Sequence, residues 1–151
     1  AGATRQGAPD SGQVKPEVKH QVELEVEEEI TMAVRAIRGA IQLEVDEREH
    51  LLKSTAELLS KTLHANDISA DQLISILFTA TPDVTSEFPA LAARELGLGD
   101  VPLMCFVEMN VGHALPRVIR VMINVETDKQ RAEIQHVYLR GAAALRLDLA
   151  Q

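Results

Sequence analysis

The chain has 151 residues, of which 46% are hydrophobic, and it carries a formal net charge of -8 at pH 7. These values indicate one globular domain of the usual size, about 100 to 200 residues, and they argue against nucleic acid as a partner, because phosphate binding needs a clustered basic face. A single cysteine excludes an internal disulfide and is typical of a reducing compartment. No apolar run approaches the roughly 20 residues of a membrane span, and no N-terminal stretch resembles a secretory signal, so we expect a cytoplasmic protein with no membrane partner.

The first thirty residues differ in composition from the rest of the chain. Residues 1–21 are rich in Gly, Pro, Gln and charged residues, which predicts a mobile leader. Residues 22–27 alternate Val or Leu with Glu, as a one-sided strand does, but a block of glutamates follows, so an edge strand and disorder are both open. We expect residues 1–30 to form a flexible N-terminal extension and residues 31–151 to form the functional domain.

Two early segments have the pattern of strands. Residues 32–39, MAVRAIRG, predict a first core strand, on which Arg35 and Arg38 project from opposite faces because they are an odd number of residues apart. Gly39 leaves room for close backbone approach beside Arg38. Residues 72–79, QLISILFT, are uncharged and rich in branched side chains, which predicts a strand covered on both faces.

Helical spacing appears in two places. In residues 46–64, leucines and threonines recur every three or four positions and form one apolar stripe, which predicts one long helix. Asp46 and Glu49 resemble a capping box at its start, and Asn66 is a natural stop. Residues 89–97, PALAARELG, begin with proline and end with glycine, which predicts a brief second helix.

The second half of the chain reads mainly as strands. Residues 101–110 predict a strand on which Cys105 and Glu108 face opposite sides, so the backbone would have to bend for both to serve one pocket. Residues 136–139 predict a short strand that carries Tyr138, the only tyrosine.

Residues 116–127, PRVIRVMINVET, place a permanent cation in an otherwise apolar strand. Alternation assigns one aliphatic face to the core, whereas the other face carries Arg120 beside Val118 and Met122. A guanidinium with such neighbours needs an anionic partner or water. The sequence alone leaves open whether this face is simply solvated.

The available chemistry is narrow. The five histidines and one cysteine show no metal-ligand spacing, and we find no glycine-rich phosphate loop, no GxSxG elbow and no paired-carboxylate site. What remains is a set of arginines, one carboxylate, one thiol and one phenol on or near short strands. Such a set suits an anionic small molecule held by charge-assisted hydrogen bonds.

Five stretches, in this order and spacing, together resemble one known family. They are MAVRAIRGA, LFTATPDVTSEFPALAAREL, VPLMCFVEM, IRVMINVETD and HVYLRGAAALRLDL, and the resemblance covers about Thr31 to Leu149. The chain resembles the monofunctional chorismate mutases of the small trimeric pseudo-α/β-barrel class. This resemblance implies an α+β fold, with a mixed β-sheet packed against one long helix, and a homotrimer whose active sites lie at subunit interfaces.

The resemblance also implies roles for individual residues. Arg120 matches the arginine that approaches the breaking ether oxygen, Arg38 and Tyr138 match groups that hold carboxylate, and Glu108 and Cys105 match groups near the ring hydroxyl and the breaking bond. Other matched positions form the wall or the mobile C-terminal cover of the pocket: Phe88, Ala90, Arg94, Leu103, Met104, Phe106, Val107, Leu145 and Arg146. Arg38, Cys105, Glu108 and Arg120 would be the catalytic set, with no metal.

Three positions depart from the family pattern. Leu91 stands where relatives often have lysine, Met104 where threonine is common, and Leu147 where proline is frequent. These changes make the predicted pocket mouth less cationic, remove one polar wall contact and affect the C-terminal cover.

The expected activity is the Claisen rearrangement of chorismate to prephenate, on the route to phenylalanine and tyrosine, by electrostatic stabilisation without a covalent intermediate or cofactor. Two alternatives stay open from the residues alone. One is a non-catalytic trimeric binder of an aromatic carboxylate, and the other is a small trimeric deaminase or hydrolase.

Overall fold

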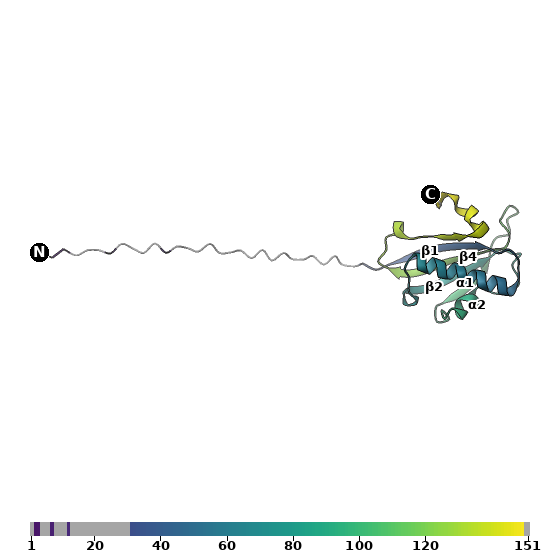
Figure 1. The fold of residues 1–151 in the computed structure, drawn as a ribbon, viewed down its shortest axis with the longest axis horizontal. Coiled ribbons are helices and arrows are strands. Elements are labelled where there is room, and N and C mark those ends of the chain that lie inside the picture. Colours follow the sequence, from purple (N-terminus) through teal and green to yellow (C-terminus); the bar gives the residue numbers. More distant parts are fainter. Residues whose placement is uncertain (1, 4–6, 8–11, 13–30, 150–151) are drawn as a thin grey trace.

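The computed structural model describes residues 2–3, 7, 12 and 31–149 (Figure 1). The predicted extension, residues 1–30, therefore lies outside the described residues apart from those four positions. The elements in chain order are β1 (Ala33–Gln42), α1 (Arg48–Ala65), η1 (Ala70–Gln72), β2 (Leu73–Ala80), α2 (Ala90–Glu95), β3 (Leu103–Val107), β4 (Val118–Thr127), η2 (Arg131–Glu133), β5 (Val137–Leu139) and η3 (Arg140–Leu149).

The strands form one mixed sheet in the order β3-β2-β4-β1-β5. The central strand β4 runs antiparallel to both β1 and β2, whereas β1 with β5 and β2 with β3 are parallel pairs. The long helix α1 lies along one face of this sheet (Figure 1). The predicted α+β fold, a mixed sheet packed with one long helix, is confirmed.

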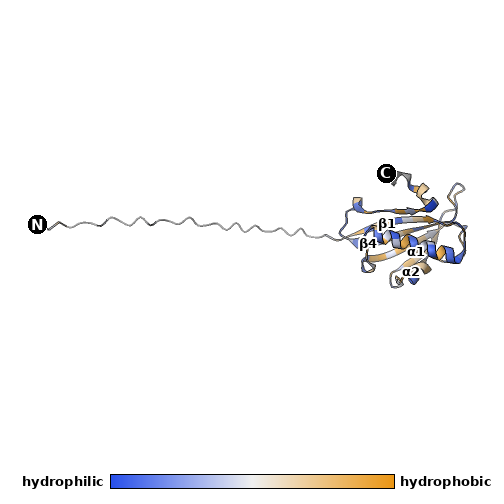
Figure 2. Ribbon diagram, in the orientation of Figure 1, coloured by the Kyte–Doolittle hydropathy of each residue, from blue (hydrophilic) through white to orange (hydrophobic). Residues whose placement is uncertain are grey.

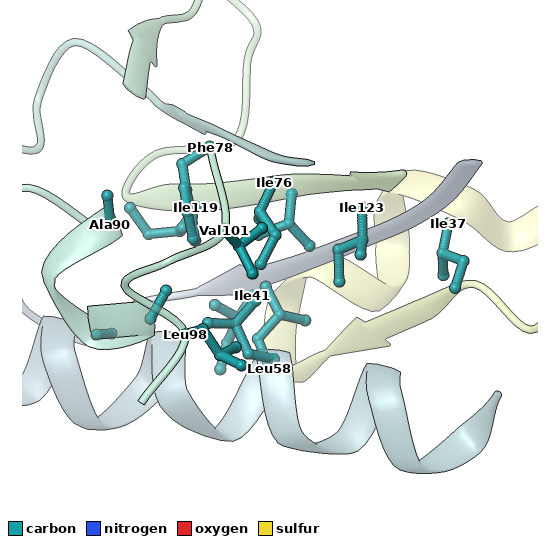
Figure 3. Packing of buried hydrophobic residues seen from close by; sticks show 14 of the residues in the cluster. Ile37, Ile41, Leu58, Ile76, Phe78, Ala90, Leu98, Val101, Ile119 and Ile123 are labelled. Carbon is teal, nitrogen blue, oxygen red and sulfur yellow. The ribbon is translucent and has the colours of Figure 1, made fainter. Parts of the chain in front are cut away.

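The core lies between α1 and the sheet. On β4 the predicted aliphatic face is buried, since Ile119, Ile123 and Val125 are fully covered and Val121 is almost so. They pack with the apolar stripe of α1 and with Ile37, Ile41, Ile76 and Phe78 from the neighbouring strands (Figure 3). Hydrophilic and hydrophobic residues both recur along each turn of α1 (Figure 2), as in an amphipathic helix. The apolar face of the strands and the apolar face of α1 thus pack together in a single layer.

The helix α1 approaches the sheet closely at Gly39. A Cβ at this position would lie 3.1 Å from Leu58 Cδ1, 3.1 Å from Val121 Cγ2 and 3.2 Å from Thr62 Oγ1. Glycine is therefore favoured sterically, and the neighbouring residue, Arg38, is fixed on the opposite face of the sheet.

The predicted capping box is wrong. The helix starts at Arg48, with Glu47 at the N-cap and no side-chain cap hydrogen bond. Asp46 instead accepts hydrogen bonds from the backbone N–H and hydroxyl of Thr85 and from the N–H of Ser86. These bonds hold the pKa of Asp46 below its usual value, although burial opposes them as the largest single influence. The Asp46 carboxylate therefore holds the loop before α2 in place. A local sequence motif does not reveal this contact, because its partners are about forty positions apart.

The prediction that β2 is covered on both faces also fails within the single chain. Ile76 and Phe78 are buried against the core, but Leu77 and Thr79 on the other face line a cavity. The second short helix is confirmed at Ala90–Glu95, and Gly97 follows it with a φ of 86°, in the left-handed region.

Candidate active site

Strand register gathers the predicted polar side chains on the sheet face that lies away from α1. On β1 and β4, Arg38 is opposite Met122 and Ala40 is opposite Arg120. On β2, Thr79 is also opposite Arg120. Cross-strand partners share a face of the sheet, so the two arginines and Thr79 project to the same side. Arg35 projects to the other side, as its odd spacing from Arg38 predicted.

This face contains a cavity of about 310 Å³. Its charged and polar lining consists of Arg38, Thr79, Glu108, Arg120, Tyr138 and Arg146, and its apolar lining comes from Leu77, Phe106, Val121 and Met122 together with Gly39. Three guanidinium groups against one carboxylate favour a small anion as the ligand of this cavity, because a guanidinium presents paired donors that match carboxylate oxygens.

Arg120 and Glu108 form the central ion pair of this cavity. Arg120 Nε lies 2.7 Å from Glu108 Oε1, and the hydroxyl of Thr79 donates to the same carboxylate oxygen at 3.1 Å. The Glu108 side chain is only 17% exposed, whereas that of Arg120 is 46% exposed. Because the pair uses Nε, the two terminal nitrogens of Arg120 remain as donors for a ligand.

Arg38 and Tyr138 come from the adjacent strands β1 and β5. Tyr138 is in register with Ala40, which places it on the cavity side of the sheet. At the start of this parallel ladder, the backbone N–H of Arg38 donates to His136 Nδ1 at 2.9 Å. Burial lowers the pKa of His136 from its usual value, and the charges of Arg38 and Arg146 lower it further. Because Nδ1 accepts this hydrogen bond, it carries no proton, and the lowered pKa favours the same neutral form.

The C-terminal segment covers one end of the site. Within η3, Arg146 leaves helical geometry, with φ -137° and ψ 55°, and its side chain lines the cavity. Leu145 packs against a small cluster made by Ala40, Val118 and Ala142. This cluster explains why Val118, predicted to share the face of Arg120, is buried and not solvated.

A second cavity, of about 330 Å³, lies on the other side of edge strand β3. Its lining includes Phe88, Cys105 and Val107, and Phe106 lines both cavities. Cys105 lines this second cavity and Glu108 lines the first, so the two side chains lie on different sides, as alternation predicted. Within one subunit, Phe88, Cys105 and Val107 are thus not brought together with Arg120.

The remaining matched positions fall outside both linings. Met104 is in register with Leu77 and so lies on the face of the first cavity, 58% exposed. Arg94 is exposed on α2, whereas Ala90 is buried and Leu103 packs against the main core.

Some lining residues were not singled out from the sequence. Thr79 becomes recognisable only through its register with Arg120, which joins positions far apart in the sequence, whereas alternation along β4 had already placed Met122 on the face of Arg120. His136 carried no motif of its own. No group of three or more His, Cys, Asp or Glu within the described residues could hold a metal ion.

Comparisons with known proteins identify the family. The model of the family "Chorismate mutase type I" matches residues 34–149. The chain is 50% identical over 117 residues to chorismate mutase AroH of Thermus thermophilus, across 77% of this chain and 96% of that protein. It is 42% identical over 120 residues to chorismate mutase AroH of Bacillus subtilis, across 79% and 94%. A solved chorismate mutase from Clostridium thermocellum superposes with a TM-score of 0.72 at 41% identity, covering 73% of this chain and 98% of that one.

An arginine-lined cavity on a mixed sheet backed by one long helix defines a binding protein or enzyme for a small organic anion. The chain belongs to the chorismate mutase type I family. It is therefore a chorismate mutase, an enzyme of the isomerase class. Neither alternative, the non-catalytic binder or the deaminase or hydrolase, receives support from these comparisons. No helix of the described residues has the length and apolar character needed to cross a membrane.

Proposed function

We propose that this enzyme rearranges chorismate to prephenate in the arginine-lined cavity, within a homotrimer in which a neighbouring subunit completes each site. The observation that carries the proposal is the convergence of Arg38, Glu108, Arg120 and Tyr138 on one cavity wall. Chorismate has two carboxylates, a ring hydroxyl and an ether oxygen, and this wall offers donors and one acceptor for such a set.

Substrate binding rests mainly on the carboxylate groups. Arg38 and Arg146 offer forked donors, and the phenol of Tyr138 offers a single one. Holding both ends of a flexible dianion selects the compact shape in which the reacting carbons face each other. Because the reaction is intramolecular, this selection lowers the barrier directly.

Rate acceleration rests on Arg120. As the carbon–oxygen bond breaks and the carbon–carbon bond forms, negative charge gathers on the ether oxygen, so a donor there stabilises the transition state more than the ground state. The ion pair with Glu108 fixes the guanidinium before substrate arrives. Glu108 Oε1 receives both Arg120 and Thr79, which leaves Oε2 as the acceptor for the ring hydroxyl.

Subunit assembly would place the second cavity opposite the first. Phe88, Cys105, Val107 and Arg94 project from the outer side of β3 and from the α2 region, and Phe88 and Val107 are 71% and 76% exposed. Large exposed apolar side chains of this kind mark interaction surfaces. Docking of this apolar half onto the arginine-lined half of another subunit would cover the substrate and exclude water.

The reaction needs no group beyond these residues, because no proton, electron or second substrate is exchanged, and so we propose that the enzyme works without a cofactor. The single cysteine is typical of a protein in a reducing compartment and supports a cytoplasmic location. We assign this activity to residues 31–151 and leave residues 1–30 as an extension outside it.

The test is the loss of chorismate absorbance with the Arg120→Ala variant. We expect kcat to fall about 100- to 1,000-fold, the usual cost of one lost donor to a developing anion, with unchanged circular dichroism. Lys61→Ala is the matched control, since Lys61 is an exposed cation on α1 that pairs with Glu57, one turn away on the same helix.

Three outcomes would contradict the proposal. A folded Arg120→Ala variant with wild-type turnover would remove the assigned role. Saturable binding of a prephenate-like dianion without turnover by the wild type would indicate a binding protein, and a product that contains an added water would indicate a hydrolase.

A further inference from the structure

The backbone hydrogen bond between Arg38 and His136 joins an arginine of the active site to an imidazole outside it. His136 lines a different cavity, of about 400 Å³, together with Val34, Arg35, Ala36, Asn124, Arg131 and Ile134. Its Nδ1 accepts the N–H of Arg38 at 2.9 Å, while the Arg38 side chain lines the arginine-rich cavity. The same residue thus contacts His136 through its backbone and the substrate site through its guanidinium.

The hydrogen bond from Arg38 N–H to His136 lies just beyond the end of the backbone pairing between β1 and β5. The parallel pairing of β1 with β5 begins at Gly39 and Val137, so Arg38 is the first residue beyond it. The neighbouring backbone groups of Gln135 are already bonded, because its N–H donates to Asn66 Oδ1 at 2.7 Å and its carbonyl accepts Asn66 Nδ2 at 2.8 Å. The imidazole therefore supplies the acceptor that the ladder lacks, and it fixes the strand from which Arg38 projects.

We propose that His136 is a positioning residue of this enzyme: its neutral Nδ1 holds the backbone of Arg38 so that the guanidinium meets a substrate carboxylate. This inference rests on the proposed role of Arg38. An imidazolium carries protons on both nitrogens and cannot accept a hydrogen bond, so protonation of His136 replaces an attraction by a clash of two N–H groups.

The charged side chains that share the cavity of His136 or act on its pKa are arginines. Arg38 and Arg35 come from β1, Arg131 from η2 and Arg146 from the C-terminal segment, and no carboxylate of the described residues lines the cavity that His136 shares. Partial burial, together with the charges of Arg38 and Arg146, lowers the pKa of His136 below its usual 6.5. The bond is intact above this lowered pKa and is lost as the pH falls through it, so activity stays flat near neutrality and declines only below pH 6.5.

The experiment compares His136→Asn with His136→Leu. Asn places an amide oxygen near the position of Nδ1 and does not titrate, whereas Leu has similar bulk and no acceptor. We expect His136→Asn to keep kcat/KM within about 3-fold of wild type, and His136→Leu to lose about 10- to 100-fold, mostly through KM, because a misplaced carboxylate donor weakens binding and orientation. Thermal unfolding of each variant shows whether the fold is retained.

The pH profile supplies the second measurement. Wild type should lose kcat/KM below pH 6.5, whereas His136→Asn should keep it until the substrate carboxylates titrate, near pH 4 for groups of this kind. His64→Asn, at an exposed position on α1, is the control and should follow wild type.

Equal activities of the Leu and Asn variants, or identical acid limbs in wild type and His136→Asn, would overturn the inference. Absence of chorismate turnover by wild type would instead contradict the proposed function, so the two failures are distinguishable.

Discussion

At the residue scale, two donors share one oxygen of Glu108. Arg120 Nε and Thr79 Oγ1 both reach Oε1, at 2.7 Å and 3.1 Å, and the carboxylate has little exposure to water. When the terminal nitrogens of Arg120 also bind the ether oxygen of a substrate, the Thr79 hydroxyl is a second donor that holds the carboxylate in place. Thr79 therefore matters most while the substrate is bound, which the ion pair alone does not suggest.

Replacement of Thr79 by Val tests this second donor. Valine has the shape of threonine without the hydroxyl, and a hydrogen bond to a charged group contributes about 1.5 to 3 kcal/mol. We expect kcat/KM for chorismate to fall about 10-fold or more, while Thr79→Ser, which keeps the hydroxyl, retains most activity. A Val variant as active as the Ser variant would show that Arg120 alone positions Glu108.

At the scale of elements, the helix and strands could be read from periodicity, whereas their connections could not. The alternation in β4 and the leucine stripe of α1 each show which side chains are buried within one element. A single sequence is therefore enough to predict this strand and this helix. Asp46 illustrates the limit: its spacing from Glu49 suggested a cap, but its carboxylate bonds a loop about forty positions later in the chain. A side chain with two competing partners is assigned correctly only when the tertiary structure is known.

Gly39 joins the packing of α1 to the geometry of the site. An added Cβ would lie 3.1 Å from atoms of both Leu58 and Val121, so Gly39→Ala forces the helix away from the sheet, and overpacking of this kind costs about 1 to 3 kcal/mol. We expect a lower midpoint in urea unfolding and reduced kcat/KM, because Arg38 moves with the strand. Gly99→Ala is the control, since its Cβ would meet only Arg94 Cγ, at 3.8 Å; equal midpoints for the two variants would contradict this account.

At the scale of the whole molecule, several of the residues matched by the family resemblance line two different cavities on opposite sides of β3. Alternation along residues 101–110 already predicted that Cys105 and Glu108 cannot serve one pocket of one straight strand, and the structure keeps them apart. The sequence could thus predict candidate residues for the site, but not which cavity each side chain lines, because that depends on strand order. The proposed site between subunits would bring the two cavities together for one reaction.

Mixing two impaired variants tests the shared site. Arg120→Ala disables the arginine-lined half, and Phe88→Asp places a carboxylate in the apolar half, where it repels the substrate dianion; Phe88 is 71% exposed, so the change spares the core. If each site combines halves from two subunits, co-refolded mixtures contain sites with both halves intact, up to roughly one quarter of the total in a random closed oligomer. We expect chorismate turnover to rise in the mixture to about that fraction of wild type, whereas either variant refolded alone keeps only its low residual turnover. A mixture no more active than the sum of its parts would place the complete site within one subunit.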